Sequence, residues 1–259
     1  MAKSSEFRLL QSLDVGFIVF TVLIVLTAYP LLRPIGLPIA IDPMTREVYG
    51  IIERLPPNSV VLQCYDIVSG QWSDISPACA ATLGHILKKG GRVVVVDFLR
   101  GEGALLASKV FALATEGKKY GVDYVNLGFI PGGETAMTAF GNDVKKAVSK
   151  DFSGTPIENI PLMKDLNSIK DFALIMSFSE NIVQEMRQWS PQNPKIIGVP
   201  NTMGVPTFMP YYNAKQLIGF LPGLRGGAEY EQLIGKPGLG SSGQDAQSLA
   251  LLLIMALIV

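Results

Sequence analysis

The sequence predicts a single α/β domain with a mainly parallel sheet, flanked by an apolar segment at each end. Short β-rich runs alternate with stretches of helical periodicity, which is the pattern of βαβ units. Near the N-terminus 18 consecutive residues carry no charge, and no charge follows Asp245. The 259 residues are 17% charged, below the roughly 25% usual in soluble domains. This composition suits one globular domain joined to membrane segments.

The first apolar run, residues 15–32, is expected to be a transmembrane helix that follows an N-terminal tail, residues 1–14. The run reads VGFIVFTVLIVLTAYPLL and would span about 27 Å as a helix, close to the roughly 30 Å hydrocarbon core of a bilayer. A buried core helix is rarely apolar on all sides. A cleaved signal peptide has a shorter apolar run and an A-x-A site, which is missing after this run.

Residues 244–259 are expected to form a second, incomplete transmembrane segment. The 14 residues after Asp245 are uncharged, but they reach only about 21 Å as a helix. Either the chain ends partway through the bilayer, or it is a piece of a longer one. The sequence therefore predicts an integral membrane protein whose first partner is the lipid bilayer. Few charges flank the spans, so the distribution of Lys and Arg does not fix the orientation. The free thiols favour a cytosolic position for the domain.

The elements between the two spans follow in order. Residues 33–42 are Pro-rich and predict an extended linker. Asp42 then caps a short helix with Pro43 at its first position, which opens an α/β domain over residues 43–210. Residues 153–170 predict a loop with a short helix over a sheet edge. Further strands are expected at residues 60–65, 92–98, 124–130, 172–177 and 195–199, and helices at 77–87, 104–115, 135–149 and 181–189. With right-handed crossovers these elements make a Rossmann-like three-layer sandwich.

Residues 211–243 predict a juxtamembrane helix followed by a Gly- and Ser-rich linker over residues 235–243. Within the helical stretch, Gly219, Gly223 and Gly227 stand at positions i, i+4 and i+8. On one helix these glycines would form a smooth stripe that permits close approach of a second helix. The alternative, that the glycines break the helix, is equally open.

Ligands of open parallel sheets bind at the carboxyl ends of the strands, which ranks the polar residues there. Asp97, Arg100 and Glu102 follow the second strand, and the turn Gly132–Gly133 follows the third. Together they are expected to bind a small anion or a nucleotide, because free amides at a helix start attract anions. The alternative is that Asp97 caps its own loop and the glycines form a plain turn. Other polar residues at the strand ends are Asp66, Ser69, Gln71, Ser73, Ser177, Ser179, Glu180, Asn201 and Thr202.

Catalytic and metal-binding patterns are scarce in this sequence. His85 is the only histidine; it falls in a predicted helix and is interpreted as a packed or solvent-facing residue. Cys64 and Cys79 are expected to be buried, unpaired thiols. No G-x-S-x-G elbow occurs, so a serine hydrolase that uses Ser69 or Ser177 is a remote alternative. No metal site or cofactor is expected, and enzymatic activity, though uncertain, is less favoured than binding.

Three motifs carry a resemblance. RPIGLPI after the first span, DYVNLGFIPGG at the third strand and LPGLRGGAEYE before the last apolar run resemble uncharacterised prokaryotic membrane proteins that hold a Rossmann-like domain between terminal membrane helices. The order of strands and helices is also loosely similar to class I glutamine amidotransferase-like domains, whose nucleophilic cysteine and nearby histidine have no counterpart here.

These observations together predict a membrane-anchored, homo-oligomeric interaction or assembly module, with other membrane subunits as further candidate partners. The alternative is a sensor or enzyme that binds a small ligand at the strand ends. Nucleic acid is not an expected partner, because the net charge is zero and no run of Lys and Arg occurs.

Overall fold

The computed structural model describes residues 15–258, so the predicted tail, residues 1–14, lies outside the described residues. Its centre is a six-stranded, all-parallel sheet in the order β3-β2-β1-β4-β5-β6. The predicted α/β class with a parallel sheet is confirmed. The strands are β1 (Val60–Asp66), β2 (Arg92–Asp97), β3 (Tyr124–Phe129), β4 (Leu174–Ser179), β5 (Ile196–Pro200) and β6 (Gly219–Phe220).

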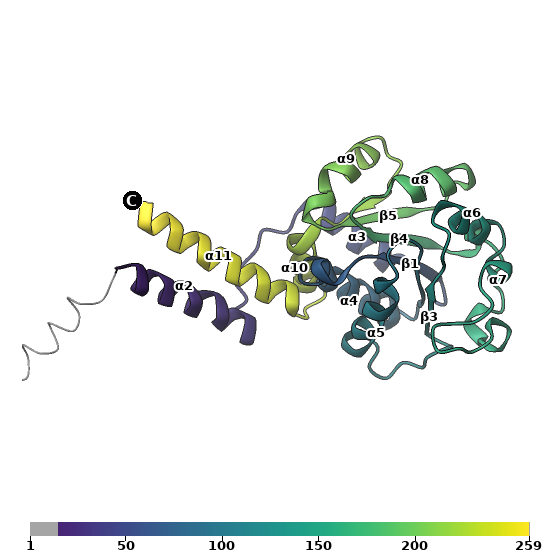
Figure 1. The fold of residues 1–259 in the computed structure, drawn as a ribbon, viewed down its shortest axis with the longest axis horizontal. Coiled ribbons are helices and arrows are strands. Elements are labelled where there is room, and N and C mark those ends of the chain that lie inside the picture. The colour runs from purple at the N-terminus through teal and green to yellow at the C-terminus, as the bar shows by residue number, and fades with distance from the viewer. Residues whose placement is uncertain (1–14, 259) are drawn as a thin grey trace, which may run out of the picture.

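Helices cover both faces of the sheet, which makes three layers (Figure 1). Successive residues of β2 show why its apolar run has no polar interruption: Val93 and Val95 belong to one core cluster, and Val94 and Val96 belong to the other. A strand buried on both faces needs apolar side chains at every position. One face carries α3 (Pro43–Glu53), α4 (Trp72–Lys88), α5 (Glu102–Ala114) and α10 (Gly223–Leu233), and the other carries α6 (Glu134–Asn142), α7 (Val144–Ala147), α8 (Val183–Trp189) and α9 (Val205–Asn213).

Two segments differ in detail from the prediction. The helix expected over residues 135–149 is divided at Asp143, whose extended backbone (φ −153°) separates α6 from α7. Residues 153–170 contain the short 3-10 turns Ile157–Asn159 and Pro161–Met163. Just before them, Phe152 N–H donates to Asn126 O of the edge strand β3, so this part of the chain lies beside the sheet edge as expected.

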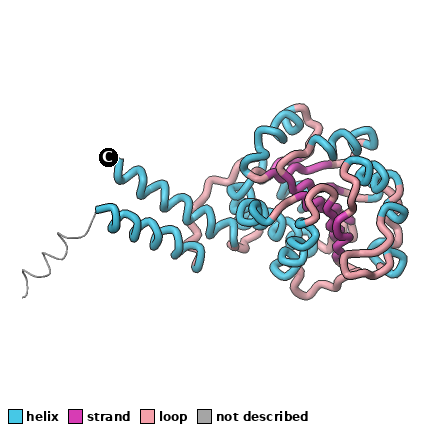
Figure 2. Tube along the Cα trace, in the orientation of Figure 1, coloured by secondary structure: helices cyan, strands magenta, loops and turns pink. Residues whose placement is uncertain are grey.

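The sheet continues past residue 210, where the sequence analysis ended the α/β domain. β6 pairs with β5 through Ile197 and Gly219, and α10 packs on the same face as α4. Figure 2 shows the strands together at the centre of the domain with helices around them. The predicted glycine stripe is therefore corrected. Gly219 lies in a strand, Gly223 begins α10 with φ +50°, and Gly227 lies inside α10.

These glycines allow close approach within the chain. A Cβ at Gly219 would lie 3.0 Å from Val48 Cγ2 of α3, and a Cβ at Gly227 would lie 2.9 Å from Pro77 Cβ of α4. Both distances are too short for ordinary packing, so a larger residue would push α3 away from β6 or α4 away from α10. The small residues thus serve the packing of this domain, and they leave no glycine stripe for a second helix.

The two terminal helices, α2 (Val15–Leu32) and α11 (Leu239–Ile258), lie side by side and leave the domain together (Figure 1). We call this pair the stem. Both helices are long and apolar enough to cross a membrane, with 18 and 20 residues. α11 begins at Leu239, inside the stretch expected to be a linker, so it reaches about 30 Å rather than the expected 21 Å.

A buried glutamate explains why the Gly- and Ser-rich stretch is helical. Glu231 is 5% exposed and accepts hydrogen bonds from the backbone N–H groups of Gly238, Gly240 and Ser241 at 2.8–2.9 Å. A carboxylate at the first turn satisfies N–H groups that have no partner within the helix, and it complements the helix dipole. α11 is therefore capped by α10 and begins on the surface of the domain.

A second carboxylate fastens the linker of α2 to α11. Asp245 is 1% exposed and accepts hydrogen bonds from the backbone N–H groups of Ile35, Gly36 and Leu37 at 2.8–3.0 Å. Hydrogen bonds to a charged acceptor contribute about 1.5–3 kcal/mol each. The inner end of α2 is thus held to α11, and α11 is held to the domain through Glu231.

Candidate ligand site at the strand ends

The strand order reverses between β1 and β4, which lie next to each other with long crossovers in opposite directions. In open α/β sheets the carboxyl ends at such a reversal leave a crevice, where ligands bind. A pocket of about 290 Å³ occupies this place, near the lower limit of the usual size for small-ligand sites. Its walls are formed by Asp66, Leu99, Arg100, Ser179, Glu180, Asn181 and Gln184.

Two buried carboxyl groups lie at this reversal. Asp66, at the end of β1, is 1% exposed; its Oδ1 accepts from Phe98 N–H (2.7 Å) and Leu99 N–H (2.9 Å). Glu185 of α8 is fully buried, and its Oε1 accepts from Ser177 Oγ at 2.8 Å.

The second oxygen of each group, Asp66 Oδ2 and Glu185 Oε2, has no hydrogen-bond partner among the described residues, and neither has Gln184 Oε1. Gln184 Oε1 is an acceptor, and the two carboxyl oxygens are acceptors when they are ionised. A buried polar atom without a partner costs about 1–3 kcal/mol, so native structures rarely contain such atoms without a reason. Asp66 and Gln184 also line the pocket, so their unpartnered oxygens, although shielded from solvent, lie next to its wall.

Burial shifts the protonation of both carboxyl groups in the same direction. Burial raises the pKa of Asp66 well above its usual range, and the charge of Glu185 raises it further, although the N–H of Phe98 opposes the shift. Burial also raises the pKa of Glu185 to about 7, against the hydrogen bond from Ser177. Two neighbouring buried carboxyl groups rarely ionise together. We therefore expect the pair to hold at least one proton at neutral pH.

The structure gives Asp97 a role within its own loop. Asp97 is fully buried; Oδ1 accepts from Leu99 N–H (3.1 Å) and Arg100 N–H (2.9 Å), and Oδ2 accepts from Gly103 N–H (2.9 Å). These bonds fix the turn between β2 and α5 in the manner of a cap. Because both oxygens have partners in the chain, the capping alternative fits this geometry better than ligand binding.

The other two candidates of that loop, Arg100 and Glu102, have different roles. Glu102 Oε2 accepts from Ser69 N–H (2.7 Å) and Ser69 Oγ (2.6 Å), and so ties the β1–α4 loop to the start of α5. Arg100 lines the pocket, and its Nη2 lies 3.8 Å from Glu180 Oε2 across the mouth. Both of these side chains are more than a third exposed. Arg100 therefore reaches the pocket, whereas Glu102 shapes the loop behind it.

The turn Gly132–Gly133 does not line the pocket. Its backbone has φ +122° and +54°, which glycine adopts without strain. Glu134 at the start of α6 pairs with Arg187 Nη1 at 2.9 Å, so a carboxylate already occupies the positive end of that helix. The geometry here is that of the plain turn.

The histidine also has a structural role. His85 is 5% exposed; Nδ1 lies 2.7 Å from Tyr230 Oη and Nε2 lies 2.9 Å from Glu53 Oε1. Burial lowers its pKa, and the bond to Glu53 opposes this. Because both ring nitrogens are bonded, His85 has none left to activate Ser69 or Ser177, which bond instead to Glu102 and Glu185.

Gln184 and Glu185 were missed from the sequence. One signal was present, because the buried positions Ile182, Met186 and Trp189 of α8 define an apolar face and residue 185 falls on it at helical spacing. An acidic residue on a core-facing stripe is unusual enough to mark a candidate site.

Cys64 and Cys79 are buried free thiols. Within residues 15–258, no group of three or more His, Cys, Asp or Glu side chains is placed to hold a metal ion. Comparisons with protein-family models, with curated proteins and with solved structures found no match.

Proposed function

We propose that this protein is a membrane-tethered domain that binds a small ligand rich in hydrogen-bond donors at the pocket between β1 and β4. The observation that carries the proposal is Asp66 Oδ2, a buried oxygen without a partner among the described residues and an acceptor when the carboxyl group is ionised, at the wall of the pocket at the strand reversal. A ligand that donates a hydrogen bond there relieves the cost of this unpaired atom.

The chemistry of the walls indicates the class of ligand. The unpartnered oxygens of Asp66 and Gln184 lie at the buried wall of the pocket, while Arg100 lies at the exposed mouth. A primary ammonium group matches the inner acceptors, and a carboxylate on the same molecule would match the guanidinium. The anion or nucleotide expected from the sequence would bring negative charge beside Glu180 and a partly ionised pair of carboxyl groups. The geometry therefore favours an amine or an amino acid.

A thermal-shift screen tests this proposal. Amines, amino acids and polyols should be compared with phosphate and nucleotides. A ligand at a hundred times its Kd stabilises the folded state by about 2.7 kcal/mol, which corresponds to at least about 5 °C in Tm for a domain of this size. Asp66→Asn should abolish the shift. The matched control is Glu134→Gln, on the same rim but outside the pocket, and it should leave the shift intact. Shifts with phosphate or nucleotides alone, unchanged in Asp66→Asn, would contradict the proposal.

The tether is the second part of the proposal. In α2 only Pro30 is buried, so its apolar side chains have no protein partner on most of the helix surface. The full chain should remain in the membrane pellet after alkaline carbonate extraction. Phe20→Arg with Ile24→Arg should release a large share of it, because each arginine near the helix centre costs about 2.5–3.5 kcal/mol on insertion. Phe20→Leu is the control. Recovery of the wild-type chain in the soluble fraction without detergent would refute the tether.

Self-association and additional membrane subunits stay predictions. The glycines that suggested them pack inside the domain, so their support is now only the apolar stem. The mass of the particle in mild detergent decides the matter, and a strictly monomeric particle would remove the idea.

A further inference from the structure

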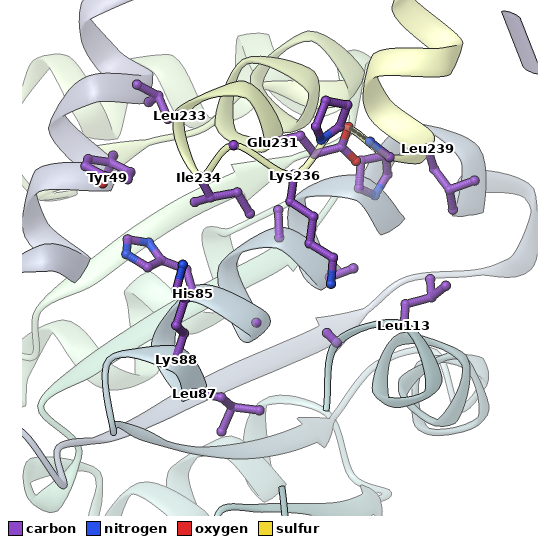
Figure 3. A pocket seen from close by; sticks show the side chains of 18 of the residues that line it. Tyr49, His85, Leu87, Lys88, Leu113, Glu231, Leu233, Ile234, Lys236 and Leu239 are labelled. Atoms are coloured by element: carbon purple, nitrogen blue, oxygen red, sulfur yellow. Dashed lines mark hydrogen bonds between the residues drawn. The ribbon is translucent and has the colours of Figure 1, made fainter. Parts of the chain in front are cut away.

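A second and larger cleft lies at the base of the stem, on the face of the domain from which α11 departs. Its volume is about 980 Å³, and it is bounded by α3, by α4 from Pro77 to Lys88, by the last turns of α5 and α10, and by the first turn of α11 (Figure 3). Pro34, two residues beyond the end of α2, lines it together with Leu239 and Ser242 of α11. One end of the cleft therefore adjoins both helices of the stem.

The charges of the cleft do not balance locally. Lys89 pairs with Glu53 at 2.9 Å, and the carboxylate of Glu231 is used to cap α11. Three further lysines of the lining, Lys88, Lys118 and Lys236, make no ion pair within residues 15–258, and Glu116 is the one acidic side chain of the lining left to oppose them. With its four lysines against Glu53, Glu116 and Glu231, the lining carries a net charge of +1, although the chain as a whole is neutral.

The same cleft exposes apolar surface at its stem end. Leu113 is 47% exposed and Leu239 is 48% exposed. Figure 3 shows Leu239 at the start of α11 and Leu113 across the cleft on α5, with Lys236 close to both in this view and Lys88 further along the cleft. Exposed leucines next to unpaired lysines therefore give the cleft both apolar and basic surface, and this combination begins at the stem. It is complementary to an anionic amphiphile that enters from a bilayer around the stem.

We propose that this cleft binds the headgroup of an anionic phospholipid, with its phosphate held by Lys88, Lys118 and Lys236 and its glycerol and first methylenes over Leu113 and Leu239. The proposal rests on the proposed membrane tether, because the bilayer supplies the lipid. Lysine ammonium groups suit a phosphate as hydrated point charges on flexible stems. The occupant would fill a cleft that is otherwise open beside the membrane surface.

The lipid that stays bound to the extracted chain tests the proposed lipid site directly. The full chain is extracted from mixed bilayers of phosphatidylcholine and phosphatidylglycerol, and the lipid that stays bound is counted by native mass spectrometry. Wild type should retain phosphatidylglycerol in preference. The triple variant K88S/K118S/K236S should weaken that retention about a hundredfold, since each lysine near a membrane surface is worth about a fivefold change in affinity. The control K150S/K170S/K195S removes three exposed lysines outside the cleft. It has the same net charge as the triple cleft variant, and it should retain lipid as wild type does.

Any of three results would contradict the lipid site in the cleft without deciding whether the chain is tethered to the membrane. Equal retention of both lipids, equal loss in both triple variants, or binding of inorganic phosphate without lipid enrichment would each refute it. Leu113→Asp provides a second route, because it removes apolar contact from an exposed position and should also lower retention. Carbonate extraction of the same membranes reports on the tether separately, since a chain that resists extraction but retains no anionic lipid keeps its tether and lacks the lipid site.

Discussion

Gly103→Ala will lower the free energy of unfolding by more than about 4 kcal/mol, an exceptional loss for one methyl group. Gly103 lies in the first turn of α5, where its N–H donates to the buried Asp97. A Cβ added there would overlap the carbonyl oxygen of Tyr65 in β1 and lie 3.0 Å from Asp97 Oδ2. The obstacle is backbone of a central strand, which cannot rotate away as a side chain can. The methyl group must therefore displace α5 from the sheet or break the cap.

Gly84→Ala is the matched control. Gly84 lies in α4, and a Cβ there would meet Ala114 at an ordinary 3.7 Å. Alanine has a higher helix propensity than glycine, so this variant should gain about 0.5–1 kcal/mol. Chemical unfolding in mild detergent, followed by circular dichroism, compares the two. Similar changes in both variants would show that the close approach of α5 to β1 is not as tight as the structure has it.

The sequence predicts the strands well where burial leaves a pattern. β2 begins at the expected Arg92 because the run RVVVVD needs two apolar faces, and only a central strand meets that condition. The starts of helices are harder to predict from the sequence. α4 begins at Trp72 although the prediction began at Pro77, since proline is usual in a first turn and here lies inside the helix.

The candidate site was only partly predictable, because it depends on contacts between distant segments. Arg100 was found from its place after a strand, yet the pocket forms only where β1 meets β4, and strand order is not a local property. β6 has two residues, which are too few to show a hydrophobic periodicity in the sequence. The helical start of α11 depends on Glu231 reaching forward over a turn, which Gly- and Ser-rich composition alone does not reveal.

The buried pair Asp66 and Glu185 predicts an unusual dependence of stability on pH. The pKa of Glu185 is raised from 4.5 to about 7 by burial, so between these values the folded state holds a proton that the unfolded state lacks. The stabilisation from this group is complete below pH 4.5 and is lost as the pH rises through about 7, by about 1.4 kcal/mol per unit and about 3 kcal/mol in all. Asp66 acts in the same direction, since its pKa is also raised.

The measurement is the difference between wild type and Glu185→Gln in free energy of unfolding, from pH 4.5 to 8. A difference is needed because His85, whose pKa is lowered by burial, adds stability as the pH rises toward its ordinary 6.5 and partly offsets the trend. Carboxylates with lowered pKa, such as Glu53 at about 2, change the stability only below this window. Glutamine keeps the acceptor for Ser177 but cannot ionise, so the variant should gain relative to wild type as the pH rises; parallel curves would show that Glu185 does not titrate there.

The same titration separates a donor-rich ligand from an anionic one. An ammonium group beside Asp66 and Glu185 favours their ionised forms, so its binding should release a proton and tighten as the pH rises through about 7. An anion would show the opposite trend, since it binds best while the carboxyl pair is protonated. Calorimetric titration of a screened ligand in two buffers of different ionisation enthalpy gives the sign of the proton transfer. Proton release that is lost in Glu185→Gln is expected, and proton uptake would reverse the assignment of the ligand's charge.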